Sequence, residues 1–239
     1  FELYFQPIVR AKDESLYAAE ALLRIHDKNG NFISPAEAIP ILEESGLIIP
    51  VGKWIIQNAF SMCTECRKYY PEFRVSINLS YVQILKSPLM MELKQIIDHS
   101  GISCSGIIVE LTESGYLEGT PAVRSVWNDM KQLRIQIALD DFGTGYSNLM
   151  NISNLEPDIV KLDRGFTLKA LSRSYEYQLM QYVIEMVHKL NQYVCVEGVE
   201  TKEDLEKIKA LGPDLIQGYY YSKPCSRDEF LKKFFDYSE

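Results

Sequence analysis

The sequence lacks the marks of a membrane or secreted protein: no apolar run is long enough to span a bilayer, and no signal peptide is recognisable. It also has no low-complexity stretch, no internal repeat and no linker-like segment. Acidic residues exceed basic ones, and the formal net charge of −8 argues against DNA or RNA as a partner. We therefore expect a soluble, cytoplasmic domain that makes no membrane contact of its own.

Cysteine is scarce, and its five positions are odd in number and scattered, which argues against a disulfide framework and for a reducing compartment. Cys63 and Cys66 form a Cys-x-x-Cys pair, a pattern that occurs in redox sites and in half of a zinc site. Zinc would need a second pair, and the remaining cysteines are isolated. Because the pair falls within a predicted helix, we favour two structural thiols on one helix face.

The chain of 239 residues is long enough for one large domain with a substantial core. Its first residue is Phe1 and not a methionine, and this residue already lies in a strand-like run. We therefore interpret residues 1–239 as a single domain excised from a longer protein.

Strand-like and helix-like segments alternate along the whole chain. Runs rich in β-branched and apolar residues predict strands at 1–9, 16–25, 73–80, 106–112, 136–141, 158–162, 193–197 and 215–219. Amphipathic runs predict helices at 34–46, 51–70, 89–99, 121–133, 146–154, 175–190, 202–211 and 227–235. This alternation indicates βα units and a parallel sheet.

About eight short apolar strands in a chain of this length favour an α/β fold closed into a (β/α)8 TIM-type barrel. The first two strands are joined by the short polar segment 10–15, so they should pair as an antiparallel hairpin. The predicted fold is therefore a modified barrel with an antiparallel first strand.

The most informative stretch is the apolar strand 135–139, which leads directly into Asp140 and Asp141 and then into Gly143-Thr144-Gly145. Two adjacent carboxylates at the end of a buried strand repel each other, so they raise each other's pKa or recruit a cation. This arrangement predicts a metal site at the carboxyl end of the strand.

Polar side chains also end the other predicted strands. In chain order, these candidate site residues are Glu20, Asn78, Glu110, Asp140 with Asp141, Lys161, Glu197 and Gln217. Each one alone has an ordinary explanation, such as a solvated strand end or a turn former. Together they favour an active site, because the carboxyl ends of all parallel strands meet at one rim of a barrel.

The charges of these residues indicate the chemistry. Several carboxylates face only Lys161 and Arg24, which lies on the same strand face as Glu20. Carboxylate oxygens and an asparagine carbonyl suit Mg²⁺ or Mn²⁺, and a pair of such ions promotes hydrolysis of phosphoesters. Lys161 would hold the attacking water or a phosphoryl oxygen, Glu197 could accept a proton, and Arg24 is placed for a phosphate contact. The residues alone therefore predict a metal-dependent phosphoester hydrolase.

Glu20-Ala21-Leu22 resembles the signature of the EAL-domain family. The similarity continues in order through Phe5-Gln6-Pro7, Ser34-Pro35-Ala36-Glu37, Asn78-Leu79-Ser80, Glu110-Leu111-Thr112-Glu113-Ser114, Asp140-Asp141-Phe142-Gly143-Thr144-Gly145, Lys161-Leu162-Asp163, Glu197-Gly198-Val199-Glu200-Thr201 and Gln217-Gly218-Tyr219. It covers essentially the whole chain, and such an ordered set is very specific. The resemblance implies a modified barrel and a phosphodiesterase that converts cyclic di-GMP to linear pGpG.

The resemblance also implies two ions, Mg²⁺ or Mn²⁺, and a set of ligands for each. The first ion is bound by the positions that match Glu20, Asn78, Glu110 and Asp140. The second is bound by the positions that match Asp140, Asp141 and Glu197.

Other matched positions have roles around the metals. Lys161 matches the lysine that contacts the attacking water, and Gln217 matches a glutamine that completes the site. Gln6 and Arg24 match substrate-contacting positions. The glutamate that matches Glu113 steadies the loop after the paired aspartates and is linked to dimerisation and regulation. The position that matches Glu200 belongs to the same network.

The family implies a homodimer, and flanking sensory or GGDEF-type domains in a longer bacterial protein, either cytoplasmic or anchored in a membrane. Two other hypotheses remain: a catalytically silent domain that binds cyclic di-GMP or a protein partner, and a barrel hydrolase for another phosphoester. Silent members usually lose metal ligands, and all of the expected ligands are present here, which favours the enzyme. Tyr219-Tyr220-Tyr221 could stack on a guanine, but we expect a packed strand end there.

Overall fold

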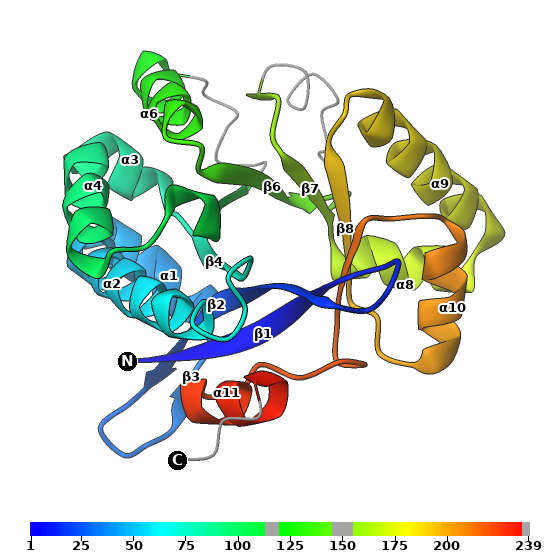
Figure 1. The fold of residues 1–239 in the computed structure, drawn as a ribbon, viewed down its shortest axis with the longest axis horizontal. Coiled ribbons are helices and arrows are strands. Elements are labelled where there is room, and N and C mark those ends of the chain that lie inside the picture. Colours follow the sequence, from blue (N-terminus) through cyan, green and yellow to red (C-terminus); the bar gives the residue numbers. More distant parts are fainter. Residues whose placement is uncertain (113–119, 145–154, 236–239) are drawn as a thin grey trace.

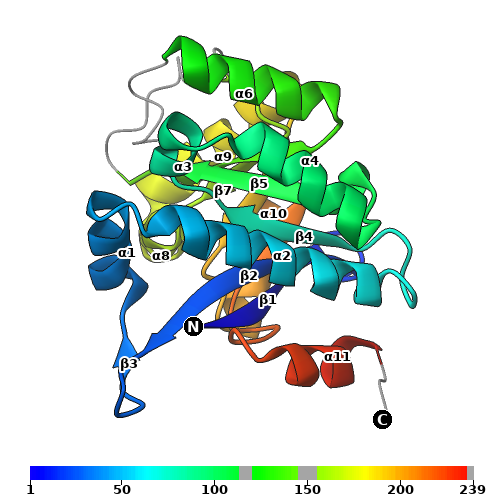
Figure 2. The same ribbon diagram turned by 90° about the vertical axis from the view of Figure 1, so that its left-hand side faces the viewer.

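The computed structural model describes residues 1–112, 120–144 and 155–235, and within them eight strands close into a barrel (Figures 1 and 2). In spatial order they are β1 (Glu2–Arg10), β9 (Leu215–Gln217), β8 (Tyr193–Glu197), β7 (Ile159–Leu162), β6 (Gln136–Phe142), β5 (Ile107–Thr112), β4 (Arg74–Asn78) and β2 (Leu16–His26), which pairs back to β1. A short strand, β3 (Phe32–Ile33), extends from β2 outside the barrel. The predicted barrel is confirmed.

Strand β1 is antiparallel to both of its neighbours, β2 and β9, whereas the neighbouring pairs from β2 round to β9 are parallel. A short turn joins β1 to β2, and its ends are tied by the hydrogen bond from Arg10 N to Ser15 O at 2.9 Å. Only antiparallel strands can be joined by so short a connection. The predicted antiparallel first strand is therefore confirmed, and it places Gln6 opposite Glu20.

Helices surround the barrel on its outer face (Figures 1 and 2). They are α1 (Pro35–Glu44), α2 (Ile48–Cys66), α3 (Tyr81–Lys86), α4 (Leu89–Ser100), α6 (Pro121–Gln132), α8 (Arg164–Ser172), α9 (Ser174–Lys189), α10 (Lys202–Ala210) and α11 (Arg227–Phe235). The longer helices bury an apolar stripe; α4, for example, buries Leu89, Leu93 and Ile96 at helical spacing.

Two helices, α3 and α8, were not predicted, because each is short and follows a strand directly. Ser80 caps α3 by a capping box with Gln83, and the Asp163 carboxylate caps α8. The helix predicted at 51–70 instead spans Ile48–Cys66, because the chain turns after Cys66. The helix predicted at 146–154 lies outside the described residues.

The barrel interior is built in layers, and its lower layer is apolar. It consists of Ile8, Tyr17, Ala18, Ile108, Ala138, Ile159, Cys195 and Leu215. Because side chains alternate along a strand, the residue two positions nearer the carboxyl end of a parallel strand points into the same interior, one layer higher. The apolar layer is therefore the floor on which the next layer rests.

The paired cysteines of α2 are buried structural thiols. Cys63 and Cys66 form no disulfide, and the Cys63 sulfur lies 3.5 Å from the backbone oxygen of Gly106. Burial raises the pKa of the Cys63 thiol to about 12. This environment agrees with the structural interpretation and not with a redox pair.

Among the helices of the described residues, none combines the length and apolar character needed to cross a membrane.

Candidate active site

The layer above the apolar floor is polar, and it contains most of the side chains that the sequence singles out. Its buried members are Gln6, Glu20, Ser76, Glu110, Asp140, Lys161 and Gln217, joined by the partly buried Glu197. On six of the parallel strands, the polar residue lies two positions after a residue of the apolar floor. The spacing of two residues thus brings seven strands and β1 together at one rim.

Lys161 lies at the centre of this layer. Its ammonium nitrogen is 2.6 Å from Glu110 Oε2 and 2.7 Å from Glu197 Oε1. It is also 3.4 Å from an oxygen of Glu20 and 3.4 Å from Asp140 Oδ1. The side chain is only 2% exposed, so a single buried cation contacts carboxylates from four strands and offsets only part of their charge.

Amide side chains hold Glu20 from two sides. The amide nitrogens of Asn78 and Gln217 each donate a hydrogen bond to Glu20, both at 2.7 Å. Gln217 also donates to Gln6 Oε1 at 3.2 Å, and Gln6 donates to the backbone oxygen of Ser222. The predicted substrate residue Gln6 is therefore connected to the carboxylate cluster through Gln217.

Ser76 belongs to the site, although the sequence did not single it out. It is fully buried on β4, and its hydroxyl donates a hydrogen bond to Glu110 Oε1 at 2.5 Å. Its position two residues before Asn78 on the same strand face was the available signal. Lys161 and Ser76 together satisfy both oxygens of a fully buried carboxylate.

The environment separates the acidities of the two buried glutamates. Burial opposes ionisation of Glu20, but Lys161, Gln217 and Asn78 outweigh it and lower its pKa. Burial and the neighbouring Glu20 raise the pKa of Glu110 well above its usual value, despite the contact with Lys161. The cluster therefore resists full ionisation unless more positive charge is supplied.

The remaining groups show the same excess of negative charge. Burial, together with Asp140 and Glu20, raises the pKa of Glu197 to about 8 despite Lys161. Partial burial and the adjacent Asp140 raise the pKa of Asp141 to about 6. Burial disfavours the charged form of Lys161, but the surrounding carboxylates outweigh it and raise its pKa well above the usual value.

The paired aspartates occupy different positions. Asp140 points into the buried layer, whereas Asp141 is exposed and has a positive φ of 59°. The register between β6 and β7 shifts between Leu139 and Phe142 at this point. Such an irregularity at a barrel rim re-aims adjacent side chains, so both carboxylates can serve the same rim.

The donor set suits hard divalent cations, because it consists of carboxylate oxygens and one amide. Asp140 Oδ1 is buried and accepts no hydrogen bond from the described residues, although Lys161 lies within ion-pair distance. This oxygen is therefore free to bind a metal cation. Within the described residues, no group of three metal-ligating side chains is already arranged to hold a metal ion. The carboxylates face the Lys161 ammonium instead, and ligation would require their rotation toward an ion.

Two cavities adjoin the polar layer. One of about 250 Å³ is lined by Glu20, Asp140, Glu197, Tyr219 and Arg164, among others. The other, of about 290 Å³, shares Leu22 with the first and has mainly apolar walls.

The predicted substrate residue Arg24 lines the second cavity and not the first. Its guanidinium lies over the rings of Tyr4 and Phe32, at 5.3 and 5.7 Å from the ring centroids. The two rings therefore restrict the position of its charge. Arg24 and Glu20 lie on the same strand, β2, but the structure places Arg24 in a different cavity from the carboxylate cluster.

Glu200 lies at the rim of the first cavity, where Arg164 donates to its Oε1 through Nε and Nη2 at 3.2 and 2.7 Å. Arg164 was not predicted, because it opens a helix that the sequence pattern did not reveal. Glu113 lies outside the described residues. The expectation of a packed strand end at Tyr219–Tyr221 holds only in part: β9 ends at Gln217 and Tyr219 is 50% exposed and lines the cavity, whereas Tyr221 packs against the core.

Gly218 explains how the ends of β8 and β9 come so close together. A Cβ atom at this position would lie 2.0 Å from the backbone oxygen of Val199. No side chain can be accommodated at that distance, because the obstacle is backbone. Glycine therefore allows Gln217 and Glu197, which are paired in register, to share the rim.

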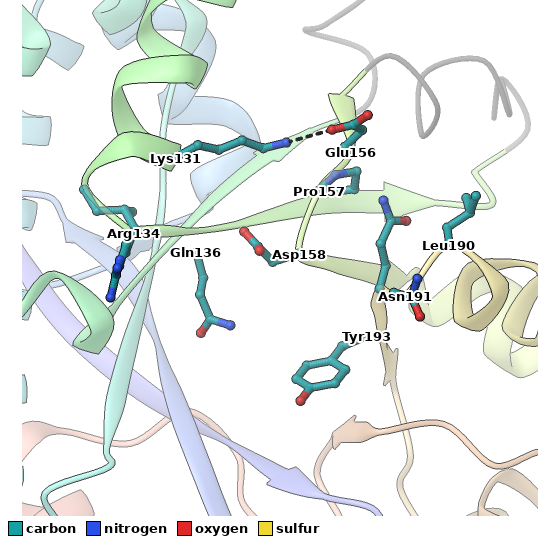
Figure 3. Close-up of a pocket in the computed structure, with 11 residues that line it drawn as sticks. Lys131, Arg134, Gln136, Glu156, Pro157, Asp158, Leu190, Asn191 and Tyr193 are labelled. Carbon is teal, nitrogen blue, oxygen red and sulfur yellow. Dashed lines mark ion pairs between the residues drawn. The ribbon is translucent and has the colours of Figure 1, made fainter.

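A cavity of about 810 Å³ opens at the opposite end of the strands (Figure 3). Lys131 and Glu156 form an ion pair of 3.5 Å at its edge, and Asp158 accepts the backbone N–H of Ile137. These contacts tie the starts of the strands together, and polar contacts at this face of a barrel serve stability. The carboxylate cluster lies at the other rim, so we assign the candidate active site there.

The fold and the site define a known class. The EAL domain family model matches residues 1–224, and the chain belongs to this family. The uncharacterized protein y4lL of Sinorhizobium fredii is 34% identical over 96% of this chain, and the cyclic di-GMP phosphodiesterase PdeF of Escherichia coli is 31% identical over 94%. The chain spans 27% and 30% of the lengths of these relatives.

Solved structures agree with this assignment. The EAL enzyme Bd1971, in its cAMP and cyclic di-GMP bound form, superposes with a TM-score of 0.92 at 30% identity and covers 98% of this chain and 64% of its own. The PaMucR phosphodiesterase in complex with cyclic di-GMP has a TM-score of 0.89 at 27% identity, with 96% and 93% covered. The family therefore includes cyclic di-GMP phosphodiesterases.

Proposed function

We propose that this domain is a phosphodiesterase that hydrolyses cyclic di-GMP to linear pGpG with two Mg²⁺ or Mn²⁺ ions. The observation that carries the proposal is the convergence of Glu20, Glu110, Asp140 and Glu197 on Lys161 at the carboxyl rim of the barrel. Family membership and the cyclic di-GMP named for PdeF, Bd1971 and PaMucR support the choice of substrate.

The proposed ligands are divided between two ions. Glu20, Asn78, Glu110 and Asp140 would hold one, and Asp140, Asp141 and Glu197 would hold the other. The chemistry that these ions supply, when bound, is neutralisation of the phosphodiester charge and a lower pKa for a water molecule. Rotation of the Asn78 amide would be needed, because its nitrogen now faces Glu20.

The chain's own residues position the reactants. Lys161 donates hydrogen bonds to the attacking water or to a phosphoryl oxygen, and Glu197 is placed to accept a proton. The new bond joins the water oxygen to phosphorus, the bond from phosphorus to the 3′ oxygen breaks, and the 3′ oxygen receives a proton. Gln217 keeps Glu20 oriented, and Gln6 and Arg24 contact the nucleotide.

We further propose that the domain works as a homodimer within a longer cytoplasmic or membrane-anchored bacterial protein with sensory or GGDEF-type domains. The chain spans only about a third of the length of curated relatives, which supports the proposal of a longer protein. Glu113 and Glu200 would link the rim to dimerisation and regulation. Residues 1–239 would form one domain in this arrangement.

The test is hydrolysis of cyclic di-GMP with Mg²⁺ or Mn²⁺ by the wild type beside Glu20→Ala and Asp140→Ala. Loss of a cluster carboxylate should lower the rate by about 10²-fold or more. Glu206→Ala is the matched control, because Glu206 is exposed on α10. Binding of the nucleotide without linear product would indicate a silent sensor, and equal rates in all variants would refute the assigned site.

A further inference from the structure

We propose that Lys161 limits the affinity of the rim for divalent cations, because its ammonium group occupies the point on which the carboxylates converge. The inference rests on the proposed function only in taking these carboxylates as the metal ligands. It assigns to Lys161 an effect on metal affinity that is opposite in sign to the effect of every ligand around it.

The contacts show direct competition for the same oxygen atoms. Lys161 takes Glu110 Oε2 at 2.6 Å and Glu197 Oε1 at 2.7 Å, and it lies 3.4 Å from Asp140 Oδ1. These are oxygens that an ion at the rim would need. Each carboxylate that turns toward an ion must weaken its contact with the ammonium group.

The ammonium group has little room to withdraw into the barrel floor, and on its other side it lines the same 250 Å³ cavity as Glu20, Asp140 and Glu197. The cavity beneath it, lined by Ser76, Ile108 and Cys195, measures only about 10 Å³. A single water needs about 10–15 Å³ and polar partners, so this apolar space cannot take an ammonium group. Lys161 is 2% exposed, and it therefore stays beside any ion that binds.

A fixed positive charge next to a bound dication is repulsive, and the repulsion is weakly screened in a buried site. Replacing Lys161 by a neutral side chain of similar length removes both the competition and the repulsion. We therefore expect Lys161→Met to bind Mn²⁺ at least tenfold more tightly than the wild type. Hydrolysis should fall in the same variant, so affinity and activity change in opposite directions.

The experiment is calorimetric titration of Mn²⁺ into protein freed of metal by a chelator. Wild type, Lys161→Met and Glu110→Gln are compared, with Lys207→Met as a matched control. Lys207 pairs with Glu203 on the surface of α10, so its removal changes the net charge equally without touching the rim. Glu110→Gln should weaken binding, Lys207→Met should leave it within about twofold of wild type, and only Lys161→Met should tighten it.

Thermal unfolding with and without Mn²⁺ provides a second readout, because a tighter ligand raises the melting temperature further. Lys161→Met and Lys161→Gln should both unfold at lower temperature than wild type without metal and gain more from Mn²⁺. If the wild type binds Mn²⁺ and both Lys161 variants bind it equally or more weakly, the inference about Lys161 is overturned and the proposed function stands. Absence of Mn²⁺ binding in every protein would instead overturn the proposed metal-dependent function.

Discussion

Identical side chains acquire different acidities in this site through their neighbours. Two amide donors and Lys161 lower the pKa of Glu20, whereas burial and the charge of Glu20 raise the pKa of Glu110. Ser76 lies on β4, between the strands that carry the two glutamates. It is opposite Glu20 in register, and its hydroxyl donates a hydrogen bond to Glu110. Ser76 therefore lies on the strand between two carboxyl groups whose pKa values are shifted in opposite directions, and it binds the one whose pKa is raised.

Ser76→Ala tests this connection. The substitution leaves Glu110 Oε1 buried without a donor, which should lower the free energy of unfolding by about 1–3 kcal/mol. We also expect the rate of hydrolysis to fall roughly tenfold, because the orientation of Glu110 is no longer held. Denaturant unfolding and initial rates measure the two effects.

Ser172→Ala is the control for that measurement. The Ser172 hydroxyl bonds only to backbone oxygens within its own helix and is exposed. Its loss should change the free energy of unfolding by less than about 0.5 kcal/mol. If Ser76→Ala behaves like Ser172→Ala in both measurements, the hydroxyl does not position Glu110.

The thiols make a second prediction at the scale of residues. Burial raises the pKa of Cys63, Cys66 and Cys195, and the thiolate is the reactive form. Iodoacetamide at about pH 8 should therefore modify Cys104 first, the partly buried Cys225 more slowly because burial also raises its pKa, and all cysteines only after unfolding. Mass spectrometry reads the result, and rapid labelling of Cys63 in the folded protein would revive the redox interpretation.

At the scale of elements, side chains at the strand–helix junctions fix where the helices begin. Thr201 Oγ1 accepts the N–H of Asp204, whose carboxylate accepts the N–H of Thr201, so each satisfies a backbone donor of the other. This capping box starts α10 directly after the rim residues of β8. The same role is played by Ser80 for α3 and by Asp163 for α8.

Thr201→Ala should lower the free energy of unfolding by about 1 kcal/mol, because the cap of α10 is lost. Thr201→Ser keeps the hydroxyl and should recover most of that stability. Both variants are measured by denaturant unfolding. Equal destabilisation by the two substitutions would mean that the methyl group, and not the capping hydrogen bond, stabilises this junction.

At the scale of the whole molecule, the two ends of the chain close the barrel together. Phe5 on β1 exchanges backbone hydrogen bonds with Cys225, at 2.7 and 3.1 Å. Phe230 of α11 is fully buried and packs against Phe5 and Phe73, with ring centroids 6.2 Å apart in each case. The family model ends at residue 224, yet α11 beyond it packs on the first strand.

Phe230→Ala should lower the free energy of unfolding by about 3–5 kcal/mol, because it opens a cavity between α11 and the barrel. Lys232→Ala, on the exposed face of the same helix, should leave stability nearly unchanged. The folded fraction of Phe230→Ala should retain hydrolysis, because Phe5 lies on the opposite face of β1 from the site residue Gln6. A loss below about 1 kcal/mol would show that α11 is not part of the cooperative core.

Much of the site was predictable, because the alternation of side chains along a strand assigns each residue to one face of the sheet. Glu20, Glu110, Lys161, Glu197 and Gln217 are polar residues within or at the end of apolar strands, and alternation places them in one layer. Ser76 escaped notice as an ordinary strand residue, although the same rule includes it. Arg164 and Tyr219 escaped because they follow the strands, where no periodic pattern operates and the chain path depends on tertiary packing.

The sequence by itself determined the barrel, its antiparallel first strand and the ring of acidic and amide side chains at one rim, since these follow from local periodicity and from the order of motifs. Only the tertiary structure decided that one ammonium group lies among four carboxylates, of which Glu20 is 141 residues away in the chain. Burial, charge and pKa depend on which distant strands become neighbours, and no local pattern specifies those distances.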